Sequence, residues 1–480
     1  MWNDLASRLA TPLRRSLCAL ALGGLTTLAQ SAVVQVINAN EPGVGFNDPT
    51  PVLPVGGNAG TTLGQQRLVA FQYAANIWAR TLKSQVPISV LATFEPLPCS
   101  DTSAVLGAAG AISVWSDFPG AEKPGTWYPS ALANKLARQD IDPGPYPDGS
   151  EADIVAFFNS ELGKAGCLAG SGYYLGLDSQ VPAGQLDLIT TLLHKLGHGL
   201  GFQNFSFGGV QLAGQPGIWD HFMYDVAARR TWLQMTEAER VASSIAPRNL
   251  VWAGEAVRSR AEQVLERGTP ELVLHGHGRH FRGERSLMVG TASFGPPLSR
   301  RPVVQAMGQV VDQLDGTGWA CTPLSAANIA RVAGKVALVD RGGCTFTVKA
   351  ANVQAAGAVA MVVVNNVAGG PPPDLGGTDP AIVIPAVRVM QEDGVLLKKL
   401  AGSNAVASLG LDMERLRGAA KGNRVLLYTP NPYAPGSSIS HWDTSALRNL
   451  LMEPFDNPGM PHAVRAPLDL TYELLKDIGW

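Results

Sequence analysis

The sequence predicts an α+β protein in which a domain of helices and a small sheet is interrupted by a β-rich segment. Residues 63–82 place apolar side chains at helical spacing, which predicts an amphipathic helix. Residues 86–94 alternate as a strand does, and 152–158 and 172–177 have the composition of further strands. From about Thr269 the composition becomes β-rich, with many glycines and prolines. This change marks the predicted interruption.

Length and composition indicate a globular protein of two or three domains. The chain has 480 residues, of which 46% are hydrophobic and 16% are charged, enough to bury separate cores. Its 37 basic and 39 acidic side chains give a formal charge of -2. This balance does not attract polyanions or an anionic membrane. We therefore expect no nucleic-acid partner, and the sequence does not fix an oligomeric state.

The first 31 residues have the pattern of a secretory signal peptide. Arg14 and Arg15 precede an apolar run over 17–28, and small residues follow up to Ala32. The run is too short to serve as a membrane span. We expect cleavage after Ser31 or Ala32 and a secreted or periplasmic protein without a membrane anchor.

Cysteine content agrees with export. Removal of the signal peptide takes away Cys18 and leaves Cys99, Cys167, Cys321 and Cys344, which allow three pairings. The simplest pairing joins Cys99 to Cys167 and Cys321 to Cys344, each within one domain. Four thiols can also hold a metal, but this wide spacing lacks a C-x-x-C element. Disulfides are therefore favoured.

Two other segments of the first domain have recognisable patterns. Residues 33–60 are rich in Gly, Pro and Asn, which predicts an extended segment on the surface. Residues 236–268 are helical in character. They begin with Thr236 followed three residues later by Glu239, which is a capping-box pattern.

The strongest chemical signal is a pair of histidines in the apolar helix predicted over 186–202. His194 and His198 are four residues apart, so both imidazoles project from one helical face, as two ligands of one tetrahedral zinc ion do. The alternative is two buried core histidines. It is disfavoured because burying two polar rings in so apolar a helix without partners costs free energy.

The residues around this pair resemble the metzincin proteases. H-x-x-x-H-G-x-G over 194–201 is similar to their zinc motif, in which Gly201 would let the helix end. The position of their usual third histidine holds Asn204. A later Ser-His-Trp-Asp at 440–443, followed by Leu-Met-x-Pro at 451–454, resembles the leishmanolysin-like branch.

The resemblance implies a zincin or metzincin-like catalytic domain with a mixed sheet and a long active-site helix. It implies that His441 is the third zinc ligand and that Met452 forms the turn below the metal. Three histidine ligands leave a fourth position for water or substrate. A protein or peptide substrate would bind extended along an edge strand, for which we select residues 172–177.

One position departs from the family pattern. The residue after the first histidine is glutamate in the family and takes a proton from zinc-bound water. Lys195 occupies this position, and a charged amine cannot accept a proton. The resemblance implies that the chain is a zinc metalloendopeptidase. The alternative is a catalytically inactive pseudoprotease that binds proteins or peptides.

The β-rich segment resembles the protease-associated, or PA, domain. A valine-rich strand at 336–340 leads into Asp-Arg-Gly-Gly-Cys-Thr-Phe over 340–346, then a helix, a second buried strand and Ile-Pro at 384–385. The resemblance implies a non-catalytic module inserted into a secreted protease. We place a metalloprotease domain at 32–268, the insert at 269–411 as a separate folding unit, and the rest of the metalloprotease domain at 412–480.

Other histidines are weaker candidates. His275, His277 and His280 lie among glycines near the insert boundary and are a candidate second metal site, although such a patch is more often a solvated loop. His221, with Asp220 beside it, is the alternative third zinc ligand.

The remaining candidates are structural. His462 lies in a proline-rich turn and is expected at the surface, and Arg341 is expected to pair with Asp340 or another carboxylate. A candidate Ca²⁺ cluster is more typical of a solvated turn; its members are Asp148, Glu151 and Asp153.

Overall fold

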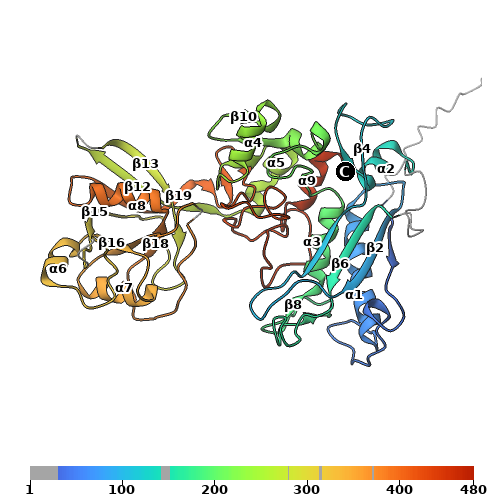
Figure 1. The fold of residues 1–480 in the computed structure, drawn as a ribbon, viewed down its shortest axis with the longest axis horizontal. Coiled ribbons are helices and arrows are strands. Elements are labelled where there is room, and N and C mark those ends of the chain that lie inside the picture. Colours follow the sequence, from blue (N-terminus) through green and yellow to red (C-terminus); the bar gives the residue numbers. More distant parts are fainter. Residues whose placement is uncertain (1–30, 142–151, 279–280, 313–315, 370–371) are drawn as a thin grey trace, which may run out of the picture.

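The chain forms two lobes joined by long paired strands (Figure 1). The computed structural model describes residues 31–141, 152–278, 281–312, 316–369 and 372–480. The predicted signal peptide, apart from Ser31, lies outside these residues, as do Asp148 and Glu151 of the candidate Ca²⁺ cluster. In the described segments, no helix combines the length and the hydropathy that a membrane span needs.

A mixed sheet forms the base of the larger lobe, as the sequence predicts. Its strands are β1 (Val34–Asn38), β2 (Ile88–Glu95), β6 (Ile154–Asn159) and β3 (Gly107–Ala111), in the order β1-β2-β6-β3. β1, β2 and β6 are parallel, and β3 runs antiparallel to β6. β3 therefore lies at one edge of the sheet.

The prediction of a surface segment over 33–60 is wrong at its start, because 34–38 form β1. Val34 is buried and pairs with Ile88 of β2. The alternating Val-Gln-Val-Ile pattern at 34–37 is a strand signal, but the glycines and prolines that follow obscure it.

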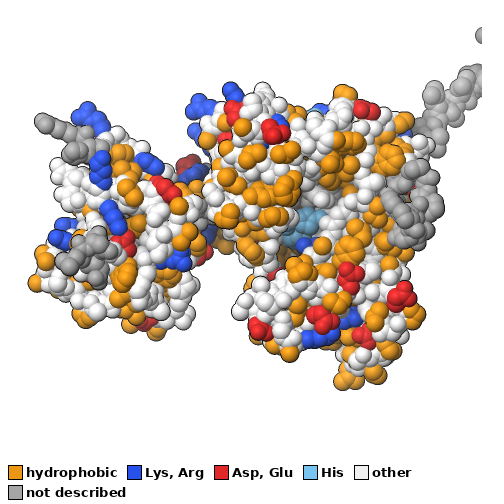
Figure 2. All heavy atoms as spheres, viewed as in Figure 1, with side chains coloured by type: hydrophobic (Ala, Val, Ile, Leu, Met, Phe, Trp, Pro, Cys, Tyr) orange, Lys and Arg blue, Asp and Glu red, His pale blue; other side chains and the backbone are white. Residues whose placement is uncertain are grey.

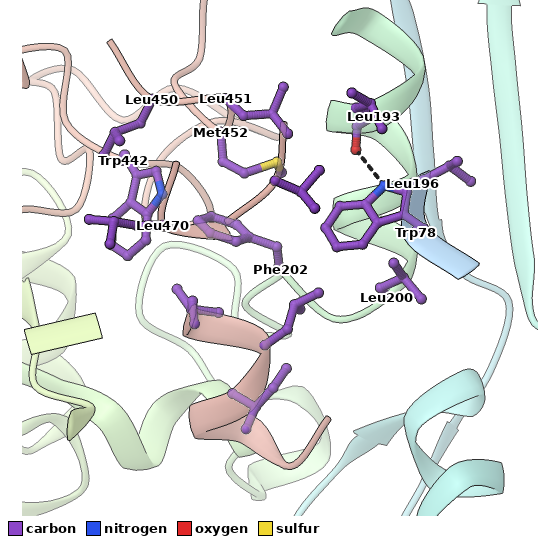
Figure 3. Close-up of a cluster of buried hydrophobic side chains, with 14 of the residues drawn as sticks. Trp78, Leu193, Leu196, Leu200, Phe202, Trp442, Leu450, Leu451, Met452 and Leu470 are labelled. Atoms are coloured by element: carbon purple, nitrogen blue, oxygen red, sulfur yellow. Dashed lines mark hydrogen bonds between the residues drawn. The ribbon is translucent and has the colours of Figure 1, made fainter. Parts of the chain in front are cut away.

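Two helices pack against each other beside this sheet. They are α1 (Leu63–Thr81) and α3 (Leu188–Gly199), and α3 also contacts β3 and β6. The Thr62 side chain caps α1 by accepting a hydrogen bond from the Gln65 amide. Trp78 is fully buried and donates its indole N–H to the Leu193 carbonyl at 3.2 Å, which ties α1 to α3 (Figure 3).

Short elements complete the larger lobe. The capping box of Thr236 and Glu239 is confirmed, and it begins α4. The predicted helical stretch 236–268 is interrupted by the buried strand β11. The elements are η1 (Gly45–Asn47), β4 (Val114–Trp115), β5 (Tyr128–Pro129), α2 (Ser130–Ala137), β7 (Tyr173–Tyr174), β8 (Leu186–Asp187), η2 (Leu212–Gly214), η3 (Ile218–Phe222), β9 (Met223–Asp225), β10 (Arg230–Thr231), η4 (Trp232–Gln234), α4 (Glu237–Ser243), β11 (Leu250–Trp252), α5 (Glu255–Val264), β20 (Ala419–Ala420), β21 (Arg424–Val425) and α9 (Thr471–Ile478).

The smaller lobe is built on a sheet in the order β13-β12-β19-β15-β16-β17-β18-β14. The predicted strand, glycine turn, helix and second buried strand are present as β16, α7 and β17. The elements of this lobe are β12 (Arg267–His277), β13 (Arg282–Met288), β14 (Gly290–Thr291), β15 (Val303–Gln309), α6 (Ala326–Val332), β16 (Val336–Asp340), α7 (Phe346–Ala355), β17 (Ala360–Val364), β18 (Ala386–Val389), α8 (Gln391–Leu400) and β19 (Val406–Leu416).

The chain enters and leaves the smaller lobe through one antiparallel pair of strands. β12 and β19 pair from Arg267 opposite Leu416 to His275 opposite Val406 (Figure 1). The buried core of the larger lobe combines residues from 32–265 with residues from 416–478. Residues from 272–409 form the cores of the smaller lobe. The proposed insert boundaries, 269 and 411, fall within the strand pair.

Disulfides lie within each lobe. Cys99 is bonded to Cys167 in the larger lobe, and Cys321 to Cys344 in the smaller lobe. The structure thus contains the simplest pairing considered from the sequence.

The expected ion pair of Arg341 with Asp340 is wrong. Asp340 Oδ1 instead lies 2.5 Å from Lys398 Nζ, and the Arg341 guanidinium donates to Asn365 Oδ1 at 3.1 Å. Asp340 is the last residue of β16 and Arg341 is the first residue of the turn that follows, and the two side chains contact different partners.

The histidine patch near the insert boundary lies on the β12–β13 hairpin. His275 Nδ1 is 3.1 Å from Glu284 Oε1 on the neighbouring strand. The side chain of His277 and the whole of His280 lie outside the described part of the chain.

Candidate metal centre

α3 carries the first two candidate ligands on one face. The Asp187 side chain caps the helix by accepting a hydrogen bond from the Ile189 amide at 3.0 Å. Gly201 follows the helix with a φ of +115°, where a side chain would be strained and would meet Ile478 and Pro129. His194 Nε2 and His198 Nε2 are 3.0 Å apart.

His441 reaches the same point from a loop far along the chain. Its Nε2 lies 3.2 Å from His194 Nε2 and 3.2 Å from His198 Nε2. The loop is held by neighbouring contacts: the Tyr428 amide donates to the His441 carbonyl at 2.9 Å, and the buried Trp442 ring contacts Phe202 at 5.2 Å between centroids. The structure therefore brings the three predicted ligands together.

The hydrogen bond made by the other ring nitrogen, Nδ1, determines the tautomer of each histidine. Nδ1 of His194 lies 2.7 Å from the Leu451 carbonyl, that of His198 lies 2.7 Å from the Phe202 carbonyl, and that of His441 lies 2.9 Å from the Ser437 carbonyl. A carbonyl oxygen only accepts hydrogen bonds, so every Nδ1 must carry the proton. In the neutral rings every Nε2 then presents a lone pair toward the other two.

This donor set fits a divalent metal ion such as zinc. Burial lowers the pKa of His194 and of His198 well below the ordinary value, and that of His441 to about 3, so the rings are neutral. Tetrahedral ligands about 2.0–2.1 Å from zinc lie about 3.3–3.4 Å apart, close to the observed 3.0–3.2 Å. Within the described residues, no other group of three or more His, Cys, Asp or Glu side chains is arranged to hold an ion.

Met452 lies against α3 next to the histidines, as the sequence resemblance implies. Its side chain is fully buried, and a Cβ added to Gly197 would come within 2.9 Å of its Sδ. Figure 3 shows Met452 in the buried cluster between the C-terminal loops and α3. Gly197 therefore allows the loop that carries Met452 to approach the helix closely.

Gly199 makes a similar close contact on the opposite side, and its replacement is expected to destabilise the larger lobe. A Cβ at this position would overlap Ile154 Cγ2 and lie 2.8 Å from Cδ1. Ile154 is buried in β6 and is stiff at Cβ, so overpacking should cost about 1–3 kcal/mol of unfolding free energy in Gly199→Ala. Chemical denaturation measures this cost.

Gly172→Ala is the matched control for this prediction. Its Cβ would meet nothing closer than 3.6 Å. A loss of stability in Gly172→Ala equal to that in Gly199→Ala would show that the contact with Ile154 is not the cause.

A cavity of about 950 Å³ opens over the histidines, and Figure 2 shows histidine side chains at the base of a hollow in the larger lobe. One wall consists of 102–109, which lead into and form β3, and the other walls come from α3 and from the loops at 433–441 and 450–460. The site therefore has a sheet edge along one side.

The selection of residues 172–177 as the substrate-binding edge strand is wrong. Only Tyr173–Tyr174 form a strand, β7, and it pairs with β8 outside the main sheet. β3 is the edge strand beside the cavity. Its sequence, Gly-Ala-Ala-Gly-Ala, lacks the β-branched and aromatic residues by which a strand is recognised, so the sequence did not indicate it.

Lys195 also lines the cavity, on the helix between the two histidines. Its side chain is half-buried, and burial lowers its pKa to about 8. Over the described ranges, no carboxylate oxygen lies within 4.0 Å of its amine.

His221 does not belong to this site, so the alternative third ligand is excluded in this structure. Its Nε2 lies 3.0 Å from Thr126 Oγ1. The adjacent Asp220 is buried and accepts a hydrogen bond from the Asn204 amide group at 2.7 Å, and burial raises its pKa to about 6. Asn204 stands where the sequence resemblance leads one to expect a third histidine, and its side chain instead contacts Asp220.

The expectation that His462 lies at the surface is wrong. Its side chain is 6% exposed, and its Nε2 lies 2.6 Å from Asp187 Oδ2. It therefore connects the C-terminal loop to the capping residue of α3. Asp153, the described member of the candidate Ca²⁺ cluster, is also buried and accepts hydrogen bonds from the Ser89 amide and the Asn134 side chain.

Glu453 is a residue of the cavity wall that the sequence did not single out. It is buried and accepts hydrogen bonds from the Leu450 amide and the Asn457 side chain. Burial raises its pKa to about 7. The resemblance assigns a role to the neighbouring Met452, but nothing in the local sequence indicates that a glutamate before a proline is buried.

Replacing Glu453 with glutamine is expected to flatten the pH dependence of stability between about pH 4.5 and 7. The folded state keeps the Glu453 proton up to about pH 7, whereas the unfolded chain loses it near pH 4.3. Glu453 therefore favours folding at low pH, and this contribution, on the order of 3 kcal/mol, is lost as pH rises to 7. Urea unfolding of metal-free wild type and Glu453→Gln across this range measures it, and parallel pH profiles would contradict it.

Comparison with known proteins identifies part of the smaller lobe. Residues 302–397 match the model of the PA domain. This segment is a PA domain. It extends from the end of the loop before β15 into α8, and so includes β16, α7 and β17.

Curated relatives share only limited regions with this chain. Signal peptide peptidase-like 2 of Arabidopsis thaliana is 39% identical over 98 residues, which are 19% of this chain and 16% of that protein. ER degradation-enhancing alpha-mannosidase-like protein 3 of Homo sapiens is 33% identical over 130 residues, which are 27% of this chain and 13% of that protein. The chain thus matches less than a fifth of the length of either relative.

Solved structures give weaker similarities. An aminopeptidase from Aneurinibacillus sp. strain AM-1 is 24% identical, covering 31% of each chain, with a TM-score of 0.23. BSAP, a zinc aminopeptidase from Bacillus subtilis, is 25% identical, covering 32% of this chain and 36% of that chain, with a TM-score of 0.22. Scores this low assign no fold to the larger lobe. The function of the larger lobe must be argued from its own residues.

Proposed function

We propose that the protein is an exported zinc metalloendopeptidase of the metzincin type, with a PA domain inserted into its catalytic domain. The observation that carries the proposal is the convergence of three Nε2 atoms within 3.0–3.2 Å while each Nδ1 faces a carbonyl. Three lone pairs at this distance repel one another unless a cation lies among them.

His194, His198 and His441 would hold the zinc ion. The bound metal supplies a Lewis acid that polarises a carbonyl and lowers the pKa of water. The three backbone carbonyls hold the rings in the orientation that directs every Nε2 to one point. The folded chain would therefore orient the three ligands even without the metal.

The proposed substrate is a polypeptide in an extended conformation. β3 is at the edge of its sheet and contributes to the cavity wall, so its free main-chain groups are placed to pair with an added strand. The cavity walls also carry exposed aromatic side chains, Phe207 and Phe455, which favour contact with apolar substrate side chains.

The PA domain supports export but does not select the reaction. It occurs here with the Cys321–Cys344 disulfide, and disulfides persist in oxidising compartments. The relatives carry the names of a peptidase and of a mannosidase-like protein. The assignment to peptide hydrolysis therefore rests on the histidine site and the sheet edge.

Metal analysis combined with a proteolysis assay tests the proposal. Protein purified in the presence of zinc is expected to contain one zinc ion per chain, and its cleavage of an unfolded protein substrate should stop with a chelator and return with added zinc. Protein that stays free of metal under zinc-replete conditions would refute the metal site.

A second function, polypeptide binding without cleavage, is favoured by Lys195. A charged amine cannot take the proton that the family glutamate accepts, and placing it next to a dication opposes its protonation and metal binding alike. In this case the zinc-loaded protein binds unfolded polypeptide and leaves it intact, which electrophoresis of the recovered substrate detects.

A further inference from the structure

Lys195 differs from other lysines that are at least partly buried, because their amines have partners within the chain. Lys349 donates to the Trp319 carbonyl at 2.6 Å and to the Gly342 carbonyl at 2.5 Å, and Lys398 pairs with Asp340. Lys135 donates to the Gly479 carbonyl at 2.5 Å. Folded proteins satisfy such donors because leaving them unpaired costs free energy.

The Lys195 amine has no such partner in the described part of the chain. Neither a carboxylate nor a carbonyl of these residues accepts from it. The amine carries N–H donors in either protonation state, so it needs an acceptor whichever form is present. Since Lys195 lines the cavity and its amine is open to it, that acceptor is either water or a group of a ligand that enters the cavity.

The acidic side chains of the cavity wall do not fill this role. Glu453 accepts from the Leu450 amide and from Asn457. Asp456 also lines the cavity, but no oxygen of either residue lies within 4.0 Å of the Lys195 amine. The site thus contains the lysine amine, which donates hydrogen bonds, and three neutral histidines. Within the described residues, no carboxylate lies beside that amine.

We infer that this site binds a carboxylate group of a polypeptide, which coordinates the metal and accepts a hydrogen bond from Lys195. The inference rests on the metal site proposed above. Three neutral imidazoles leave the charge of a divalent ion uncompensated, and a carboxylate offsets this charge while offering oxygens to both the metal and the amine. A neutral peptide carbonyl supplies a single oxygen and no charge.

A polypeptide is the favoured source of this carboxylate because of the surroundings of the cavity. The β3 edge offers main-chain hydrogen bonds to an extended chain, and a volume of about 950 Å³ holds several residues. The carboxylate belongs either to the C-terminus of that chain or to an acidic side chain, and these two sources share the same chemistry.

Calorimetric titration of zinc-loaded protein tests the inference. The probes are an N-acetylated alanine tripeptide with a free C-terminus, its C-terminal amide, and an amidated peptide with a central glutamate. We expect wild type to bind at least one carboxylate peptide about 10- to 100-fold more tightly than the alanine amide. The peptide that shows this preference identifies the source. Inorganic phosphate is titrated in parallel.

Two variants test the hydrogen bond from Lys195 to the carboxylate separately from changes in folding or zinc content. Lys195→Met keeps most of the apolar stem and removes the donors, so its preference for the acid peptide should fall to the part that the metal alone supplies. Lys195→Arg keeps donors and should retain a preference for the acid. Zinc content and thermal unfolding of each variant are measured beside the titrations.

Several results would overturn the inference. Equal affinity of zinc-loaded wild type for acid and amide peptides does so, as does an undiminished preference in folded, zinc-loaded Lys195→Met. Lys195-dependent binding of phosphate alone would exclude a polypeptide carboxylate. Wild type that binds no zinc would overturn the metal site and this inference together, whereas the other results leave the proposed metal site intact.

Discussion

Replacing Lys195 with glutamate is expected to raise the rate of peptide-bond hydrolysis by about 10²- to 10⁴-fold, the usual contribution of general acid–base catalysis. Lys195 lies on α3 directly after His194 and faces the cavity. A carboxylate at this position would be placed to act as general base and then general acid beside the metal that His194, His198 and His441 would hold. The measurement is kcat/KM for a fluorogenic unfolded protein substrate.

Lys195→Gln is the matched control for this gain. Glutamine has nearly the shape of glutamate and removes the amine, but it cannot serve as a base. It should therefore bind as much zinc as Lys195→Glu and hydrolyse substrate no faster than wild type. Measurable hydrolysis at equal rates in wild type and Lys195→Glu would contradict both the prediction and the binding-only function, and would show that the chain already has an effective base. No hydrolysis by either protein would contradict the predicted gain alone.

Replacing His441 with alanine is expected to weaken zinc binding by more than about 100-fold. Even outer groups that orient metal ligands contribute about 10- to 100-fold in affinity, and His441 supplies one of three Nε2 atoms directly. Competition with a chelator of known affinity measures the change. The loop should remain folded, because Trp442 stays packed against Phe202.

His221→Ala is the control for the loss of zinc. Its ring is near Thr126 and away from the three histidines, so its removal should leave zinc affinity unchanged. If His441→Ala bound zinc with wild-type affinity, His441 would be excluded as a ligand, and another side chain would have to supply the third ligand.

The local features of the site could be predicted from the sequence because they depend on short periodicities. His194 and His198 share a helical face, and Gly201 ends that helix with positive φ. The turn at 340–346 and its flanking strand and helix are also a local pattern, and they occur as predicted. In each case the physical cause lies within one element.

Features that depend on tertiary packing were missed or misplaced. β3 forms from small residues that gain their strand conformation by pairing with β6, and nothing within Gly107–Ala111 indicates it. The proline-rich turn predicts an exposed His462. Its ring is instead buried against Asp187, which lies far away in the sequence and accepts a hydrogen bond from it. The position of His441 was suggested by resemblance, and no local pattern places it near α3.

The pairing of β12 with β19 shortens the effective length of chain between the candidate metal ligands His198 and His441. His198 and His441 are 243 residues apart, but 147 of these separate Thr269 from Leu416, whose side-chain hydroxyl and carbonyl are hydrogen-bonded at 3.0 Å. Once this ladder has formed, the chain between the two ligands behaves as a loop of about 100 residues. Loop-closure entropy grows only with the logarithm of length, so the excursion adds at most about 1 kcal/mol to bringing the ligands together. The length of the PA-containing lobe therefore has little effect on the entropy of bringing His198 and His441 together.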